Sequence, residues 1–139
     1  WKVRVLAYDP YIAGGQFGAH GAEAVDYGTL LRESDVVSLN VVLNKETRHM
    51  MGADELELMK PSAILINTSR GAVADELALA LALKKGTIAS AALDVFEDEP
   101  LPESSPLREL GDRVLLSPHL VSGNVGSGLR PGIRWATSR

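Results

Sequence analysis

The stretch MKPSAILINTSRG, residues 59–71, contains a short apolar run that is followed directly by polar side chains. Its central part, Ala63–Asn67, is continuously apolar up to the asparagine, as expected for a strand that is covered on both faces of a parallel sheet. Further β-rich runs lie on either side of it: Val3–Tyr8, Val36–Val42, Ile88–Val95 and Val114–Ser117. From Val36 onward the runs begin about 26 residues apart, which leaves room for one crossover helix each. The pattern predicts an α/β fold with a parallel sheet.

Two segments between these runs have the composition of helices. ADELELMK, residues 53–60, is rich in helix formers and precedes Pro61, which cannot continue a helix. In DELALALALKK, residues 75–85, the leucines alternate, and that period alone fits a strand. The segment nevertheless lacks β-branched residues, begins with the good N-cap Asp75, and ends with two lysines and a glycine. We therefore predict a helix over 75–85.

Weaker signals complete this outline of the chain. Glu23–Asp26 fits a short strand, and the acidic, proline-containing stretch Glu97–Pro106 fits a loop. The glycines at 14–18 and 126–128 do not form a Gly-x-Gly-x-x-Gly turn between a strand and a helix, so we assign them no dinucleotide-binding role.

The composition excludes several classes of protein. The chain has 139 residues, with 45% hydrophobic and 23% charged side chains, which is ordinary for one globular domain. Its net charge of −4 argues against a nucleic-acid partner, and no apolar run reaches the roughly 20 residues of a membrane span. With no cysteine, disulfides, thiolate metal sites and cysteine nucleophiles are excluded. No signal peptide is visible, so we predict a cytoplasmic location.

Polar or ionisable side chains follow the predicted strands. In chain order they are Asp9, Asn40, Thr68 with Arg70, Asp94 with Glu99, and His119. Ligands of an open parallel sheet bind at the carboxyl ends of its strands. Such a concentration at one edge favours a ligand site over the ordinary polarity of loops.

Two of these side chains suit an anionic or a ribose-containing ligand. Asp9 is placed to accept hydrogen bonds from a ribose diol; the alternative is an ordinary turn aspartate before Pro10. No arginine follows Asp9 directly, which favours NAD over NADP. Arg70 could hold a carboxylate through two parallel hydrogen bonds; the alternative is a solvated loop arginine.

A histidine and a carboxylate suit proton transfer. His119 follows a strand and can exchange a proton near neutral pH, and Glu99 could orient it and stabilise the imidazolium. The alternative is a solvated acidic loop, and we keep this interpretation for three of its four carboxylates: Glu97, Asp98 and Glu103. His20 and His49 are interpreted as surface residues. No His or carboxylate pair has the spacing of metal ligands, so no metal site is predicted.

Several motifs occur together in a specific order. They are VLAYDP (5–10), SDVVSLN (34–40), ETRHMM (46–51), MKPSAILINTSRG (59–71), ALDVFEDEP (92–100) and SPH (117–119). The ordered set resembles the NAD-binding domain of the D-isomer-specific 2-hydroxyacid dehydrogenases and covers most of residues 1–122. That family includes phosphoglycerate, glycerate and D-lactate dehydrogenases.

The resemblance implies roles for the residues at the strand ends. Arg70 matches the arginine that holds the substrate carboxylate and carbonyl oxygen, His119 the acid–base, and Glu99 its partner. Cofactor-binding roles are implied for Asp9 on the adenosine ribose, for Asp94 on the nicotinamide carboxamide, and for Asn40 and Thr68. The reaction implied is hydride transfer between NAD(H) and C2 of a small 2-hydroxy or 2-oxo acid.

The resemblance also predicts what this chain leaves out. Family members carry Gly-x-Gly-x-x-Gly about 20 residues before the aspartate matched by Asp9, whereas this chain begins at Trp1. We expect a Rossmann-type, doubly wound parallel sheet truncated at its N-terminus, with a gap between the runs 3–8 and 36–42. Residues 1–139 would form a partial NAD-binding domain, and the substrate domain would be absent. The alternative function is a non-catalytic regulatory module or an inactive fragment; a homodimer is a further prediction.

Overall fold

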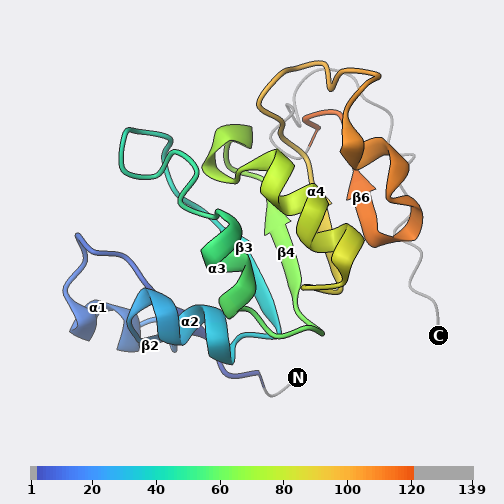
Figure 1. Cartoon of the computed structure of the whole chain (residues 1–139). Helices are drawn as coiled ribbons and strands as arrows, with labels where there is room; N and C mark the ends of the chain where they lie inside the picture. Colours follow the sequence, from blue (N-terminus) through green and yellow to red (C-terminus); the bar gives the residue numbers. More distant parts are fainter. Residues whose placement is uncertain (1–2, 121–139) are drawn as a thin grey trace, which may run out of the picture.

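The computed structural model describes residues 3–120, and the predicted α/β class is confirmed (Figure 1). The strands are β1 (Leu6–Ala7), β2 (Glu23–Ala24), β3 (Val36–Leu39), β4 (Ile64–Asn67), β5 (Ser90–Leu93) and β6 (Val114–Leu116). The helices are α1 (Gly14–Gly18), α2 (Tyr27–Glu33), α3 (Ala53–Leu58) and α4 (Glu76–Lys85), and the 3₁₀ turns are η1 (Gly71–Val73), η2 (Pro106–Glu109) and η3 (Gly111–Arg113). All pairings between these strands are parallel, in a sheet β1-β2 and a sheet β3-β4-β5-β6. The glycines at 126–128 lie outside the described range.

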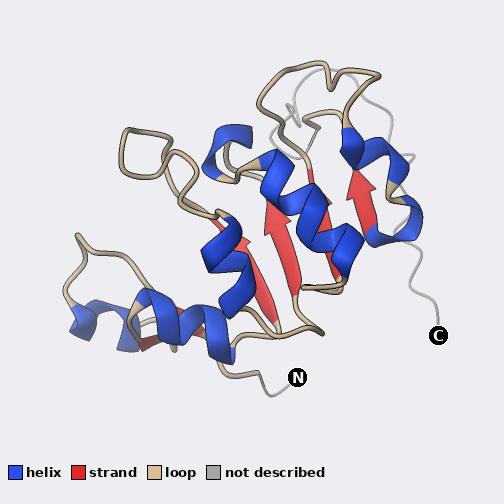
Figure 2. Cartoon of the chain, viewed as in Figure 1, coloured by secondary structure: helices blue, strands red, loops and turns tan. Residues whose placement is uncertain are grey.

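Each predicted strand is present but shorter than its apolar run. The run Val36–Val42, for example, ends as a strand at Leu39, opposite Asn67 of β4. The hydrogen bonds between two strands end where the shorter partner ends. The apolar composition of a single run therefore does not show where its strand ends. In the weaker run 23–26, Asp26 is instead the N-cap of α2 and accepts a hydrogen bond from the Thr29 N–H. Helix α1, which the sequence analysis did not predict, is visible in Figure 2.

Helix α4 forms where the alternating leucines left two interpretations open. The Asp75 carboxylate accepts hydrogen bonds from the backbone N–H groups of Leu77 and Ala78, both at 3.0 Å. At the other end Gly86 has φ +75°, a left-handed conformation that glycine adopts without a steric penalty. The capping residues at both ends therefore favour a helix over the strand that the alternating leucines would fit. Helix α3 ends at Leu58, two residues earlier than predicted, because the residues before Pro61 leave the helical conformation.

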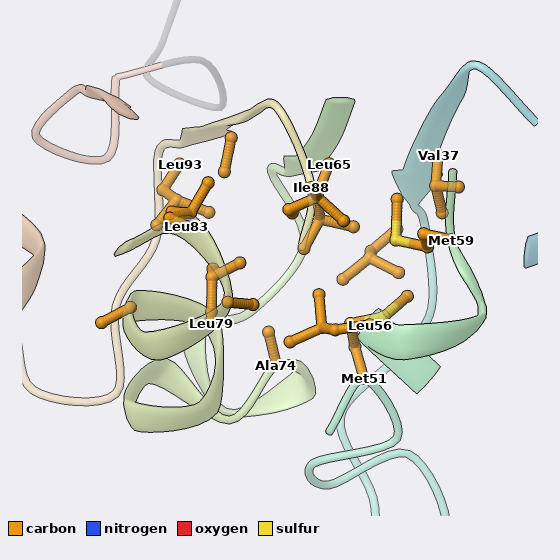
Figure 3. Close-up of a cluster of buried hydrophobic side chains, with 14 of the residues drawn as sticks. Val37, Met51, Leu56, Met59, Leu65, Ala74, Leu79, Leu83, Ile88 and Leu93 are labelled. Carbon is orange, nitrogen blue, oxygen red and sulfur yellow. The ribbon is translucent and has the colours of Figure 1, made fainter. Parts of the chain in front are cut away.

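The hydrophobic core lies between the larger sheet and helices α3 and α4 (Figure 3). Alternate strand residues point into it, among them Val37, Leu65 and Leu93, and each is almost completely buried. They meet Leu56 of α3 and Leu79 of α4. Burial of one such side chain stabilises the fold by roughly 1.5–3 kcal/mol. This layer fixes the positions of the strand ends that carry the predicted site residues.

The opposite face of the larger sheet is more open than predicted. Val36 is 52%, Ile64 37% and Leu115 69% exposed, and these residues point away from α3 and α4. The prediction that the run Ala63–Asn67 is covered on both faces is therefore wrong within residues 3–120, where Ile64 is partly exposed. A continuous apolar run shows that both faces of a strand are suited to packing. It does not show that a helix or loop within residues 3–120 packs on the second face.

The expected separation between the first strand and β3 is observed. No hydrogen bonds join β1 to β3 within residues 3–120, and the two sheets remain separate. A cavity of about 870 Å³ lies between them and is lined by residues from β1, α2 and β3. No helix within residues 3–120 has the length and apolar character that a membrane crossing requires.

Candidate active site

The predicted site residues fall into three groups on the carboxyl side of the strands. Glu99 and His119 line a cavity of about 510 Å³ at the end of β6. Asp9 and Asn40 line the larger cavity between β1 and β3. The remaining residues are Asp94, which is buried after β5, and Thr68 and Arg70, which are exposed on the turn after β4 and line neither cavity.

Glu99 and His119 are in direct contact. His119 Nδ1 lies 2.7 Å from Glu99 Oε2, although the two residues are 20 positions apart in the chain. Because an ionised carboxylate only accepts hydrogen bonds, we assign the proton of this contact to Nδ1. Nε2 is then the ring nitrogen that can exchange a proton with a ligand. A carboxylate also stabilises the imidazolium that results from protonation.

Backbone contacts hold both members of this pair. The second oxygen of Glu99, Oε1, accepts a hydrogen bond from the Phe96 N–H at 3.0 Å. His119 has φ +53°, in the left-handed region, and its N–H donates to the Ser117 carbonyl at 3.1 Å. A non-glycine residue in this region costs on the order of 1 kcal/mol, so the surrounding turn must maintain it.

Asp94 supplies the contacts that maintain this turn. Its side chain is buried, at 3% exposure, and Oδ1 accepts hydrogen bonds from Ser117 Oγ at 2.5 Å and from the Leu120 N–H at 2.9 Å. Asp94 thus bridges the residues on both sides of His119. The family resemblance implies a cofactor-binding role for Asp94, whereas this bridge has no signal in the sequence.

The turn that carries Arg70 is organised by a buried asparagine. Asn67, at the end of β4, donates from Nδ2 to the Arg70 carbonyl at 2.9 Å and accepts at Oδ1 from the Ser69 N–H and Oγ. These hydrogen bonds fix the backbone of residues 67–70. The Arg70 guanidinium itself is exposed and donates from Nη1 to the Ser69 carbonyl at 2.6 Å. It does not contact Glu99 or His119.

Gly71 brings this turn against the loop of the acidic residues. A Cβ atom at position 71 would lie 1.9 Å from the Phe96 carbonyl carbon and 2.4 Å from the Glu97 nitrogen. The two backbones therefore touch only because residue 71 has no side chain. This requirement could not be predicted, since no signal in the local sequence distinguishes Gly71 from an ordinary turn glycine.

Glu97 departs from the prediction of a solvated acidic loop. Its side chain is 27% exposed, and Oε1 lies 3.0 Å from His49 Nε2. His49 is on the surface, as predicted, but in this ion pair. Asp98 and Glu103 form no hydrogen bond or ion pair with any residue from 3 to 120, which agrees with the prediction for these two side chains.

The contact with His119 lowers the pKa of the Glu99 carboxyl below its ordinary value, and the hydrogen bond from Phe96 N–H acts in the same direction. A carboxyl whose pKa is lower in the folded state contributes stability above its unfolded pKa and loses it as the pH falls through the folded pKa. We therefore expect the stability contributed by the Glu99–His119 contact to be present above the ordinary carboxyl pKa and to be lost as the pH falls through the lowered pKa of Glu99. A carbon-detected NMR titration of the Glu99 carboxyl measures this. In His119→Asn the pKa should rise towards the ordinary value; an unchanged pKa would contradict the assignment.

The larger cavity has the chemistry that one part of a dinucleotide requires. Asp9 accepts a hydrogen bond from the Tyr11 N–H at 2.8 Å and presents a carboxylate beside apolar side chains such as Leu6 and Val37. A carboxylate accepts hydrogen bonds from a ribose diol, and apolar walls suit the faces of a base. The residues present thus fit a nucleotide. Residues 3–120 contain no cluster of three His, Asp or Glu side chains that could hold a metal ion.

Comparison with protein families agrees with this chemistry. Residues 1–121 match the family model described as "D-isomer specific 2-hydroxyacid dehydrogenase, NAD binding domain". A glyoxylate reductase of Thermococcus litoralis is 61% identical over 102 residues, which are 73% of this chain and 30% of that protein. A glyoxylate reductase of Korarchaeum cryptofilum is 49% identical over 122 residues, 88% of this chain and 36% of that protein.

Solved structures of related proteins have the same fold. A glyoxylate reductase from Paecilomyes thermophila superposes with a TM-score of 0.77 at 38% identity, covering 88% of this chain and 36% of that one. The NAD-complexed D-isomer specific 2-hydroxyacid dehydrogenase from Lactobacillus delbrueckii ssp. bulgaricus gives 0.72 at 33% identity, covering 84% and 38%. The chain spans about a third of the length of the curated relatives it matches.

Proposed function

Because this chain belongs to the D-isomer specific 2-hydroxyacid dehydrogenase family, we propose that it supplies the acid–base pair and the NAD site of an oxidoreductase acting on small 2-hydroxy and 2-oxo acids. The observation that carries the proposal is the contact of 2.7 Å between His119 Nδ1 and Glu99 Oε2, two residues that line the same cavity. Bound NAD(H) would supply or accept the hydride.

The residues of this chain would handle the proton and the substrate's charge. In the direction of reduction, His119 donates the Nε2 proton to the oxygen on substrate C2, and Glu99 stabilises the imidazolium before the transfer. Arg70 binds the substrate carboxylate, for which its planar guanidinium can form two parallel hydrogen bonds. Asp9, Asn40, Thr68 and Asp94 form the proposed cofactor contacts. Oxidation reverses the proton transfer.

Glyoxylate is the first substrate to test. Several relatives are named glyoxylate reductases, which supports a 2-oxo acid with a small substituent on C2. For the cofactor we propose NAD, since Asp9 is followed by a proline and not by an arginine that could pair with a 2′-phosphate.

We expect the protein, expressed as its gene encodes it, to oxidise NADH in the presence of glyoxylate and to use NADPH less well. Arg70→Gln should raise the KM for glyoxylate by about 10- to 100-fold, because hydrogen bonds to a charged group are lost, and should leave the KM for NADH nearly unchanged. Initial rates from NADH absorbance measure both constants. Binding of NADH without turnover of any 2-oxo acid would contradict the proposal and favour a non-catalytic module.

A homodimer and a cytoplasmic location extend this proposal. The homodimer is supported by the family resemblance, and the location by the sequence analysis. Sedimentation of the expressed protein and fractionation of the cells that produce it would measure these two properties.

A further inference from the structure

We propose that Glu97 is a positioning residue for the reaction. Its side chain joins residues 48–51 (the His49 segment) to the first residue of α4. This contact holds residues 67–71 (the Arg70 turn) at a fixed place relative to residues 96–99 (the Glu99 loop). The inference rests on the proposed function and deepens it. The Glu97 side chain contacts neither Glu99 nor His119, so its effect would pass through the positions of Arg70 and Glu99.

The Glu97 carboxylate contacts two separate parts of the chain. Oε1 lies 3.0 Å from His49 Nε2 and accepts from the Glu76 N–H at 3.5 Å, at the first residue of α4. Oε2 lies 3.6 Å from Arg48 Nη2. In return, the Glu97 N–H donates to Glu76 Oε1 at 2.5 Å. Glu97 and Glu76 thus satisfy each other's backbone groups, and the loop after β5 is attached to α4.

The His49 segment is in turn attached to the residues that follow Arg70. The His49 N–H donates to the Ala72 carbonyl at 2.8 Å, and the Met51 N–H donates to the Val73 carbonyl at 3.2 Å. The Met51 carbonyl accepts from the Asp75 N–H at 3.0 Å, so residues 49–51 lie parallel to residues 72–75. Any displacement of His49 therefore moves the backbone directly after Arg70.

Backbone packing at Gly71 connects the Arg70 turn to the loop that contains Glu97 and Glu99. The Gly71 backbone lies against the Phe96–Glu97 peptide, and the Phe96 N–H holds Glu99 Oε1. Arg70 and Glu99 are consequently connected by adjacent backbone groups, with Glu97 between them. The carboxylate of Glu97 is the side chain that ties this junction to the His49 segment.

The charges around Glu97 agree with a tethering role. Burial is the main cause that raises the pKa of Glu76 above its ordinary value. The hydrogen bond from the Glu97 N–H acts against it, and the nearby carboxylates of Glu97, Asp98 and Glu99 raise the pKa further. Retaining Glu97 next to another carboxylate is unfavourable unless cations compensate, and Arg48 supplies such a charge. A glutamate surrounded by water would not require a cation such as Arg48 beside its carboxylate.

The test compares Glu97→Ala and Glu97→Gln with Asp98→Ala, which removes a neighbouring carboxylate that has no hydrogen bond or ion pair within residues 3–120. In the protein as its gene encodes it, we expect Glu97→Ala to raise the KM for glyoxylate about 10-fold or more, since small displacements of a binding group are costly. The KM for NADH should stay near the wild-type value. Glu97→Gln, whose amide oxygen still accepts from Glu76 N–H, should recover most of the loss, and Asp98→Ala should match wild type.

A second readout does not depend on turnover. In heteronuclear NMR spectra, Glu97→Ala should shift the backbone amide signals of Arg70 and Gly71, and Asp98→Ala should leave these two signals in place. If Glu97→Ala matches Asp98→Ala in both readouts, the proposal is overturned. Should Glu97→Ala fail to fold, His49→Gly removes the side chain that contacts Glu97 and tolerates the left-handed backbone of residue 49 at φ +54°. An unchanged KM and spectrum in that variant would overturn the proposal equally. A wild-type protein without turnover would instead refute the proposed function.

Discussion

Replacing His119 with asparagine is expected to lower kcat by about 10²- to 10⁴-fold, the range that general acid–base catalysis contributes. Asparagine tolerates the left-handed backbone that His119 adopts at φ +53°, so the turn should survive the exchange. The variant loses the ring nitrogen that would deliver the proton to the substrate oxygen. Stopped-flow measurement of NADH oxidation, with thermal unfolding recorded in parallel, separates a loss of chemistry from a loss of fold.

A matched histidine exchange serves as the control for this prediction. His20 is exposed on the surface, and His20→Asn should leave kcat unchanged. Glu99→Gln tests the partner: its amide can still accept from His119 Nδ1 but no longer supplies a negative charge. We expect a smaller loss of kcat than in His119→Asn, because the amide still orients the imidazole ring but supplies no negative charge beside it. A His119→Asn variant that retains at least a third of the wild-type kcat would remove His119 from the proposed mechanism.

Gly71→Ala is expected to destabilise the protein by about 3 kcal/mol or more, at the upper end of the cost of overpacking. The added Cβ would lie 1.9 Å from the Phe96 carbonyl carbon and 2.1 Å from its oxygen. Both atoms belong to the backbone, which cannot turn aside as the end of a flexible side chain can. The clash must separate the Arg70 turn from the Glu99 loop, so the KM for glyoxylate should rise as well. Urea denaturation at pH 7 measures the free energy of unfolding.

Gly15 offers the contrasting glycine. Apart from its chain neighbours and the backbone of its own helix, no atom lies within 4 Å of a Cβ placed there. The residue is inside helix α1, where alanine is favoured over glycine by roughly 0.5–1 kcal/mol. Gly15→Ala should therefore leave the stability unchanged or raise it. Equal stabilities for the two variants would show that the close approach at Gly71 can relax without cost.

Secondary structure and the strand-end residues could be predicted because their signals are local. The Asp75 cap and Gly86 identified α4 despite its alternating leucines, and both residues act within one turn of the helix. Spacing along the chain predicted parallel strands, since each crossover needs a minimum length. Glu99 and His119 were selected by their places after two predicted strands, and the resemblance over most of residues 1–122 gave them paired roles. The structure brings the two side chains together.

The exact strand ends and the surroundings of the site could not be predicted in this way. The bridge from Asp94 to Ser117 and Leu120 joins two strand ends, and no pattern in either segment reveals the other. The same applies to the open face of the sheet: Val36 and Leu115 are apolar in sequence, and the presence or absence of a covering element depends on segments elsewhere.

The amino-acid sequence by itself determined the α/β class, the order of the elements and the strand ends at which polar residues occur. Apolar periodicity, helix caps and spacing act over short distances along the chain, and this is why they can be recognised there. Only the tertiary structure decided that Glu97 pairs with His49, 48 residues away, and that Gly71 must lack a side chain. Such contacts depend on how separate segments are packed against one another, and packing is a property of distances in space that the linear order of residues does not contain.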